Sequence, residues 1–245
     1  MAKLKGQTCY YCGAPAVSRE HIPPKEFFKG HLCDSITVPS CDLHNSQKSQ
    51  LDQAVMSALL IPLKNERHIY KLDNDVQVAI TNAEANFNRA KRLTSSASLI
   101  SDLPAGLLPN VAYLRADIYT WIRQVVAGLF WYAIKRRDET LQWDQIQVWS
   151  PDWLPLPLGT TLSTNEFHDL WHERYSYIAV LEKMNWVDGW SSRPRPYPKS
   201  IFYFQTHMTQ DEVNFKIVFF EKYRWYISST PKPQIIEHLK RMFLP

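Results

Sequence analysis

Two short pairs of possible metal ligands, Cys9-x-x-Cys12 and Cys41-x-x-His44, lie in the N-terminal part of the chain. Two residues between the members of a pair allow one turn of the backbone to point both side chains at the same ion. Two such pairs complete the tetrahedral coordination of a structural zinc. The spacing therefore predicts a zinc site, whereas a redox dithiol or buried thiols are the alternatives for either pair alone. We expect the remaining cysteine, Cys33, to be a free thiol of the core rather than a further ligand.

A second set of reactive side chains is interleaved with these ligands. Glu20 and His21 lie between the two pairs, and Asn45, Lys48 and Asp52 follow the second pair. Residues at positions i, i+3 and i+7 share one face of a helix, so the last three are expected to point the same way. The preceding zinc ligand then points about 100° away from them. Asp52 can orient Lys48 as its i+4 partner, although a solvated ion pair is the alternative for both.

The order of these residues resembles the zinc-bound HNH endonucleases of the ββα-metal fold. The family pattern is C-x-x-C, then an acidic residue and histidine before an apolar residue and proline. A C-x-x-C or C-x-x-H pair follows, running into asparagine and a later lysine. The segment from Cys9 to Lys48 contains every element in that order, including Glu20-His-Ile-Pro-Pro-Lys25 and Val38-Pro-Ser-Cys-Asp-Leu-His-Asn45. The resemblance covers about one fifth of the 245 residues.

The resemblance implies a role in phosphodiester hydrolysis, in which a divalent cation stabilises the developing negative charge and a base deprotonates water. By resemblance His21 is the general base, and an ordinary histidine pKa of about 6.5 leaves it mostly neutral near pH 7. Glu20 and Asn45 are implied to bind the catalytic cation, and their hard oxygen atoms favour Mg²⁺ or Mn²⁺. Lys48 is expected to reach a phosphate or the developing charge. The chain has Glu20 where many family members have aspartate, and Lys48 where some have a third histidine.

Short elements must position these side chains. A strand is predicted over residues 19–22, and Pro23-Pro24 ends it because proline cannot donate to a strand ladder. Residues 34–40 lead back to the second zinc pair. Apolar positions at helical spacing then predict a helix from about residue 41 to about residue 60, before Pro62. The order of these elements is the one that the resemblance implies, in a module of residues 1–63.

Residues 64–245 have no such motif and are predicted to form a C-terminal domain for substrate or partner binding. One apolar face predicts a long helix over residues 111–137, ending in a basic run that suits a helix C-terminus. A polar helix is expected over 82–93, a helix near 165–175 and a terminal helix over 233–243. Aromatic and branched segments at 201–205, 213–220 and 223–228 predict a mostly antiparallel sheet within residues 140–230.

Composition limits the possible classes without choosing among them. Hydrophobic residues make up 45% and charged residues 21% of the chain, which is ordinary for a globular protein. The net charge of +4 permits a polyanionic partner but does not require one. The sequence has no apolar run of about 18 residues and no hydrophobic signal core, so we expect no membrane partner and a cytosolic location. In that compartment four cysteines indicate metal binding before disulfides.

These features together predict an α+β protein with an N-terminal zinc-stabilised HNH module and a helical and antiparallel-sheet C-terminal domain. The expected activity is endonucleolytic, with a structural zinc, a catalytic Mg²⁺ or Mn²⁺, and DNA favoured over RNA as the substrate. Analogy with HNH proteins of similar size suggests an effector of anti-phage defence or restriction, with a protein partner. The alternative is a non-catalytic zinc module that binds nucleic acid or a partner protein. A third interpretation makes the remainder of the chain a nucleotide or small-molecule sensor, although no phosphate loop supports it.

Overall fold

The computed structural model describes the parts of the chain that build the core and the candidate site. The described residues are 4, 6–28, 31, 33–49, 51–53, 55–56, 59–60, 74, 76–81, 114–135, 141–150, 176–189, 197–231 and 233–243. The helices predicted over 82–93 and near 165–175 lie outside these ranges, and so does the expected domain boundary at residue 63.

The N-terminal part is built on a β-hairpin. Strand β1 (Ser18–Ile22) pairs antiparallel with β2 (Ile36–Ser40), so that Ser18 faces Ser40 at one end and Ile22 faces Ile36 at the other. The short 3-10 helix η1 (Lys25–Phe28) follows the two prolines that end β1. Helical residues follow the hairpin between 49 and 60, with gaps in the described chain. The predicted strand–strand–helix order is present, but the helix begins at residue 49 and not near residue 41, because residues 43–48 form turns.

A second sheet occupies the C-terminal part. Its strands are β3 (Val148–Trp149), β4 (Val187–Asp188), β5 (Phe202–Met208), β6 (Val213–Phe219) and β7 (Tyr223–Ser229). They lie in the order β3-β7-β6-β5-β4, and every neighbouring pair is antiparallel. The prediction of a mixed helical and antiparallel-sheet protein is confirmed. The two short edge strands, β3 and β4, were not expected from the sequence.

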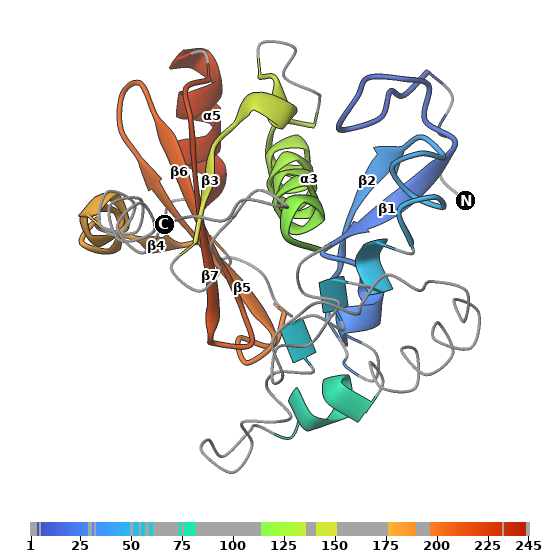
Figure 1. Ribbon diagram of the computed structural model, residues 1–245. Coiled ribbons are helices and arrows are strands. Elements are labelled where there is room, and N and C mark those ends of the chain that lie inside the picture. The colour runs from blue at the N-terminus through green and yellow to red at the C-terminus, as the bar shows by residue number, and fades with distance from the viewer. Residues whose placement is uncertain are drawn as a thin grey trace, which may run out of the picture.

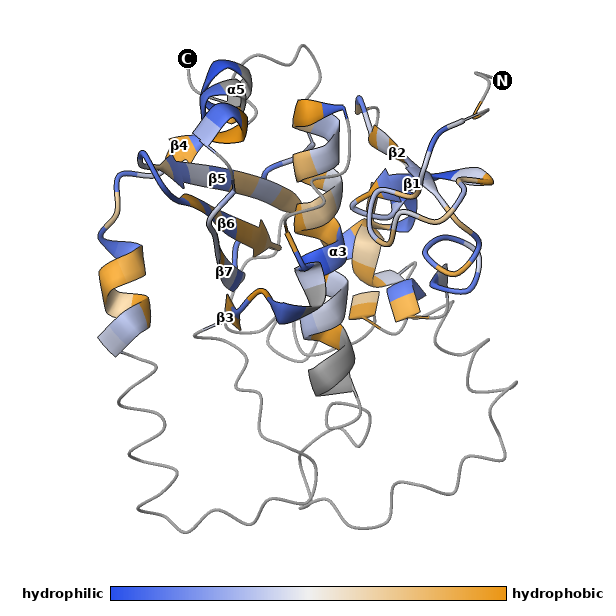
Figure 2. Cartoon of the chain, turned by 90° about the horizontal axis from the view of Figure 1, so that it is seen from above, coloured by the Kyte–Doolittle hydropathy of each residue, from blue (hydrophilic) through white to orange (hydrophobic). Residues whose placement is uncertain are grey.

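Helices α3 and α5 add to the two sheets, and residues 76–81 and 176–182 are helical as well. Helix α3 (Leu114–Ile134) lies between the hairpin on one side and the five-stranded sheet on the other (Figures 1 and 2). It ends before the basic run that was expected to close it, because Lys135 adopts a left-handed backbone with φ of 58°. Helix α5 (Pro233–Phe243) spans the predicted terminal helix. No helix among the described residues is both long and apolar enough to cross a membrane.

Helix α3 joins the hairpin and the sheet into one hydrophobic core. The Trp121 ring lies 5.7 Å from the Phe27 ring of η1 and 5.3 Å from the Phe219 ring of β6, measured between centroids. On the same helix, a Cβ built on Gly128 would lie 2.4 Å from Cγ1 of Ile22 in β1, so only glycine permits this approach. Buried residues of the hairpin, α3, the sheet and α5 form a single cluster.

Tyr197 fixes the far end of the hairpin to the C-terminal part. Its hydroxyl donates to the carbonyl of Ile22 at 2.7 Å and accepts from the backbone amide of Ile36 at 2.8 Å. These two residues face each other across the strands, so one side chain bridges them at the end where the connecting segment leaves β1 and enters β2. The Tyr197 side chain is fully buried, where hydrogen bonds are strong because water does not compete.

Candidate functional site

The four predicted zinc ligands converge in space. The Sγ atoms of Cys9, Cys12 and Cys41 and a ring nitrogen of His44 all lie within 4.8 Å of one another. Cys12 Sγ lies 3.7 Å from Cys41 Sγ, and His44 Nδ1 lies 3.2 Å from Cys41 Sγ and 3.8 Å from Cys9 Sγ. Ligand bonds of about 2.3 Å to sulfur and about 2.0 Å to nitrogen place tetrahedral donors at such separations. The geometry fits a Cys₃His zinc, and within the described chain Cys33 lies outside this set.

The hairpin brings the two ligand pairs together. The first pair lies on a tight turn, in which the amide of Gly13 donates to the carbonyl of Cys9 at 3.1 Å, and Gly13 has the positive φ of 79° that the turn requires. The second pair begins directly after β2. The amide of Tyr10 donates to the carbonyl of Pro39 at 2.9 Å, which ties the first turn to the end of that strand. Local turns therefore aim each pair, and strand pairing aligns the two.

The thiols of this set differ in their tendency to ionise. Burial raises the pKa of Cys12 to about 11. Burial also raises that of Cys9, but hydrogen bonds from His44 and from backbone amides outweigh it and lower the pKa to about 5. Hydrogen bonding within the set therefore favours the thiolate form of Cys9 more than that of Cys12. A bound zinc deprotonates a coordinating thiol outright. Zinc binding would therefore convert the Cys12 thiol, whose raised pKa otherwise keeps it protonated, into a thiolate.

A cavity of about 410 Å³ opens next to the hairpin, on the side of the predicted catalytic residues. Its lining is Arg19, Glu20, His21, Pro24, Lys25, Glu26, Asn45, Ser46, Ser49, Asp52 and Gln53. Three of the four residues predicted to be catalytic, Glu20, His21 and Asn45, therefore meet at one hollow. The fourth, Lys48, does not line the cavity but donates a hydrogen bond to Glu20.

Burial alternates along β1 around His21. Glu20 is 4% exposed, whereas Arg19 and His21 are half-buried. Burial lowers the pKa of His21, and the positive charge of Lys25 lowers it further. The imidazole is therefore kept neutral near pH 7, which is the form that accepts a proton.

Lys48 joins two buried carboxylates. Its Nζ lies 2.8 Å from Oε1 of Glu20 and 2.5 Å from Oδ1 of Asp52, so the i, i+4 contact expected from helical spacing is present. Burial raises the pKa of Glu20 to about 7 despite the lysine, and it raises that of Asp52 as well. The sequence places this ammonium group on a phosphate, whereas the structure places it in the interior between two acidic groups.

Asn45 presents its amide in a defined orientation. Nδ2 donates to Oγ of Ser18 at 2.6 Å and to the carbonyl of Arg19 at 3.1 Å. Asn45 also lines the cavity, as Glu20 does. The carboxylate and amide groups of these two residues carry the hard oxygen atoms that suit Mg²⁺ or Mn²⁺.

Three residues of this region were missed by the sequence interpretation. Arg19 and Lys25 line the cavity and bring positive charge to it. Strand alternation could have indicated Arg19, since it lies two positions before His21, and Lys25 follows the prolines of the motif directly. Trp121 donates from Nε1 to Oδ1 of Asp52 at 2.7 Å. No local signal connects a tryptophan of α3 to that aspartate.

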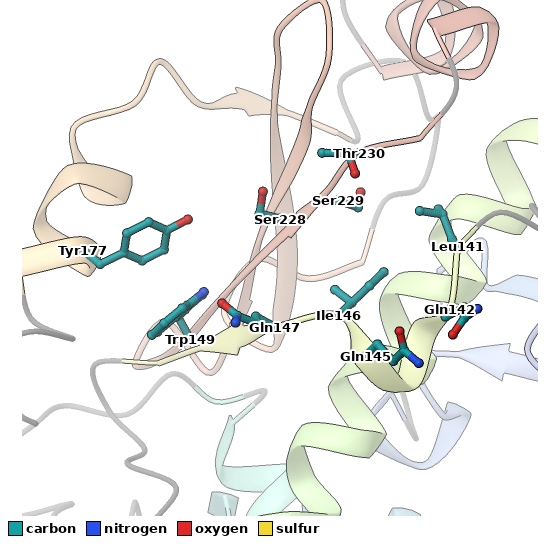
Figure 3. A pocket seen from close by; sticks show the side chains of 10 residues that line it. All are labelled: Leu141, Gln142, Gln145, Ile146, Gln147, Trp149, Tyr177, Ser228, Ser229 and Thr230. Atoms are coloured by element: carbon teal, nitrogen blue, oxygen red, sulfur yellow. The ribbon is translucent and has the colours of Figure 1, made fainter.

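A second cavity, of about 510 Å³, lies between β3, the end of β7 and the helical residues 176–182 (Figure 3). Glutamines, hydroxyl side chains and the rings of Trp149 and Tyr177 line it. Among the described residues that line it, none has an acidic, basic, histidine or cysteine side chain. The titratable side chains predicted from the sequence therefore lie at the smaller cavity beside the hairpin.

No family model, curated protein or solved structure matches the chain. The described structure defines a protein of helices and antiparallel sheets with a Cys₃His cluster that could bind a metal near its N-terminus.

Proposed function

We propose that the chain is a metal-dependent endonuclease of the HNH type, which hydrolyses phosphodiester bonds of nucleic acid and favours DNA over RNA. The observation that carries this proposal is the meeting of Glu20, His21 and Asn45 at one cavity beside the Cys₃His cluster. A purely structural zinc site requires none of these three side chains. The reduced thiols that the cluster needs suit a cytosolic protein.

In this proposal His21 accepts a proton from the attacking water, and its lowered pKa keeps it available for that step. Glu20 and Asn45 hold Mg²⁺ or Mn²⁺, which supplies charge stabilisation at the phosphoryl oxygens. Arg19 and Lys25 neutralise the substrate phosphates. The zinc cluster is assigned a structural role, because all four of its ligands come from the protein and leave no open position.

Plasmid nicking by the zinc-loaded protein tests the proposal. We expect cutting with Mg²⁺ or Mn²⁺, none with EDTA, and loss of cutting by at least a hundredfold in His21→Ala. His207→Ala is the matched control, because His207 lies on β5 of the C-terminal sheet and should leave cutting unchanged. If wild type cuts DNA and RNA no faster than His21→Ala with either metal, catalysis is refuted.

The other candidate is a non-catalytic zinc module that binds nucleic acid or a partner protein. Two apolar side chains favour it: Val17 is 63% exposed before β1, and Leu43 is 58% exposed between two zinc ligands. Binding of DNA or of another protein without any cutting would support this candidate. A role in anti-phage defence or restriction, with a partner protein, belongs to the proposal as its cellular context. Protection of cells from phage that is lost in His21→Ala would support it.

A further inference from the structure

A line of four buried polar side chains runs from α3 to β1. Trp121 donates from Nε1 to Oδ1 of Asp52 at 2.7 Å, and the same oxygen accepts from Nζ of Lys48 at 2.5 Å. Lys48 donates in turn to Oε1 of Glu20 at 2.8 Å. All four residues are at most 8% exposed, so the line is shielded from water along its length.

Stability alone does not explain such a line. A buried ion pair loses hydration, and hydrophobic side chains of similar volume often replace one without loss of stability. What an ion pair adds is a fixed position for its charged groups. Here both carboxylates, Glu20 and Asp52, also line the cavity, whereas Lys48 and Trp121 do not. The line therefore holds two acidic groups that face the proposed substrate.

Trp121 is a rigid anchor for the other end. Its indole is fully buried, with the rings of Phe27 and Phe219 at centroid distances of 5.7 Å and 5.3 Å. A packed indole keeps its N–H in one direction, which fixes the Asp52 oxygen that it bonds. Since Lys48 has a long flexible side chain, its ammonium group needs such an orienting partner.

We propose that Trp121 is a positioning residue of the cation site proposed above, and that it acts through Asp52 and Lys48. Lys48 holds Oε1 of Glu20 and leaves the second carboxylate oxygen for a divalent cation at the cavity. This inference rests on the proposed function, since the cation is that of the endonuclease. It also means that a helix of the C-terminal part helps to build the site.

A matched pair of tryptophan variants separates positioning from packing. Trp121→Phe keeps a ring in the core but removes the N–H that bonds Asp52. Trp225→Phe makes the same change at an equally buried tryptophan of the same core cluster, whose Nε1 has no hydrogen-bond partner among the described residues. Both variants lose similar packing, so a difference between them reports the hydrogen bond.

The readout is binding of Mn²⁺ to the zinc-loaded full chain, measured by calorimetry, together with the Mn²⁺ concentration that half-saturates cutting. We expect Trp121→Phe to weaken both by about tenfold, as the loss of an outer-shell partner does in metal sites, and Trp225→Phe to leave them unchanged. In a Glu20→Gln background, Trp121→Phe should have no further effect. Asp52→Asn, which keeps the side chain's size, tests the same link if Trp121→Phe fails to fold.

Equal Mn²⁺ binding by the two tryptophan variants, in a wild type that binds Mn²⁺ and cuts, overturns the positioning role and leaves the endonuclease standing. A wild type that neither binds Mn²⁺ nor cuts overturns the proposed function, and the positioning role falls with it.

Discussion

Substitution of Gly128 in α3 tests how closely strand β1 of the hairpin packs against this helix. A Cβ at this position would lie 2.4 Å from Cγ1 and 3.0 Å from Cγ2 of Ile22. Both atoms are bonded to the branched Cβ of Ile22, so turning the end of the side chain does not clear the contact. Ile22 is 1% exposed, so the surrounding side chains leave little space into which its side chain could move. Strand β1 must therefore shift to accept Gly128→Ala.

Two effects of opposite sign set the expected size. Alanine in place of glycine within a helix stabilises by about 1 kcal/mol. Overpacking a close-packed core costs about 1–3 kcal/mol, and a contact with stiff atoms belongs in the upper part of that range. We expect Gly128→Ala to lower the free energy of unfolding by about 1–2 kcal/mol. Because Ile22 adjoins His21, the same shift should slow cutting.

Urea unfolding of the zinc-loaded protein measures the change, and Ile22→Ala supplies the control. Ile22→Ala removes the atoms that clash, at a cost of its own of about 2–5 kcal/mol. In that background the helix propensity is unopposed, so Gly128→Ala should stabilise by about 1 kcal/mol. A stabilised Gly128→Ala protein, or the same effect of this substitution in both backgrounds, would contradict the predicted clash with Ile22.

Three further predictions concern the metal, the phosphates and pH. Metal analysis should find one zinc per chain, and Cys41→Ser should lose it and lower the melting temperature; an unchanged zinc content would remove Cys41 from the ligand set. For DNA binding, Arg19→Gln and Lys25→Gln should each reduce the slope of the logarithm of the binding constant against the logarithm of the salt concentration by about one. The control Lys240→Gln should leave that slope unchanged. Equal slopes in all three variants would exclude direct phosphate contacts by Arg19 and Lys25. Burial raises the pKa of Glu20 from 4.5 to about 7, so between these values the folded chain binds the extra proton and this group lowers the free energy of unfolding as pH rises. Urea unfolding from pH 5 to pH 7 should show that decline reduced in Glu20→Gln, and parallel profiles would contradict it.

The features that the sequence predicted best depend on local spacing. Both zinc pairs lie on single turns, so their geometry follows from two intervening residues. Helix α3 was expected from one apolar face and β5, β6 and β7 from aromatic and branched runs, because these patterns persist over several residues. The edge strands β3 and β4 have two residues each, which is too few for any periodicity. Tertiary pairing with β7 and β5 defines them instead.

The features that the sequence could not predict join distant segments. The hydrogen bond between Asp52 and Trp121 spans 69 residues, and that between Ile22 and Tyr197 spans 175. An aspartate one turn after a lysine predicts a local ion pair, and the pair of Lys48 and Asp52 is present. The same spacing does not predict that this pair is buried or that Trp121 bonds Asp52. Burial arises only when α3 packs on the hairpin. The sequence thus predicted a lysine that reaches a phosphate, with a solvated ion pair as the alternative, whereas the structure has an interior network.

The hairpin is held at both of its ends, and this explains why His21 can have a fixed position on a strand of five residues. At the end where β2 finishes, Cys41 leads directly into the zinc cluster, so a bound ion would fix Ser40 and its partner Ser18. At the other end, Tyr197 ties Ile22 to Ile36, and Gly128 of α3 allows β1 to pack against the helix. The zinc cluster alone cannot hold that second end. The geometry of the candidate site therefore depends on residues far beyond the motif, and a protein reduced to residues 1–63 should lose it even with zinc bound.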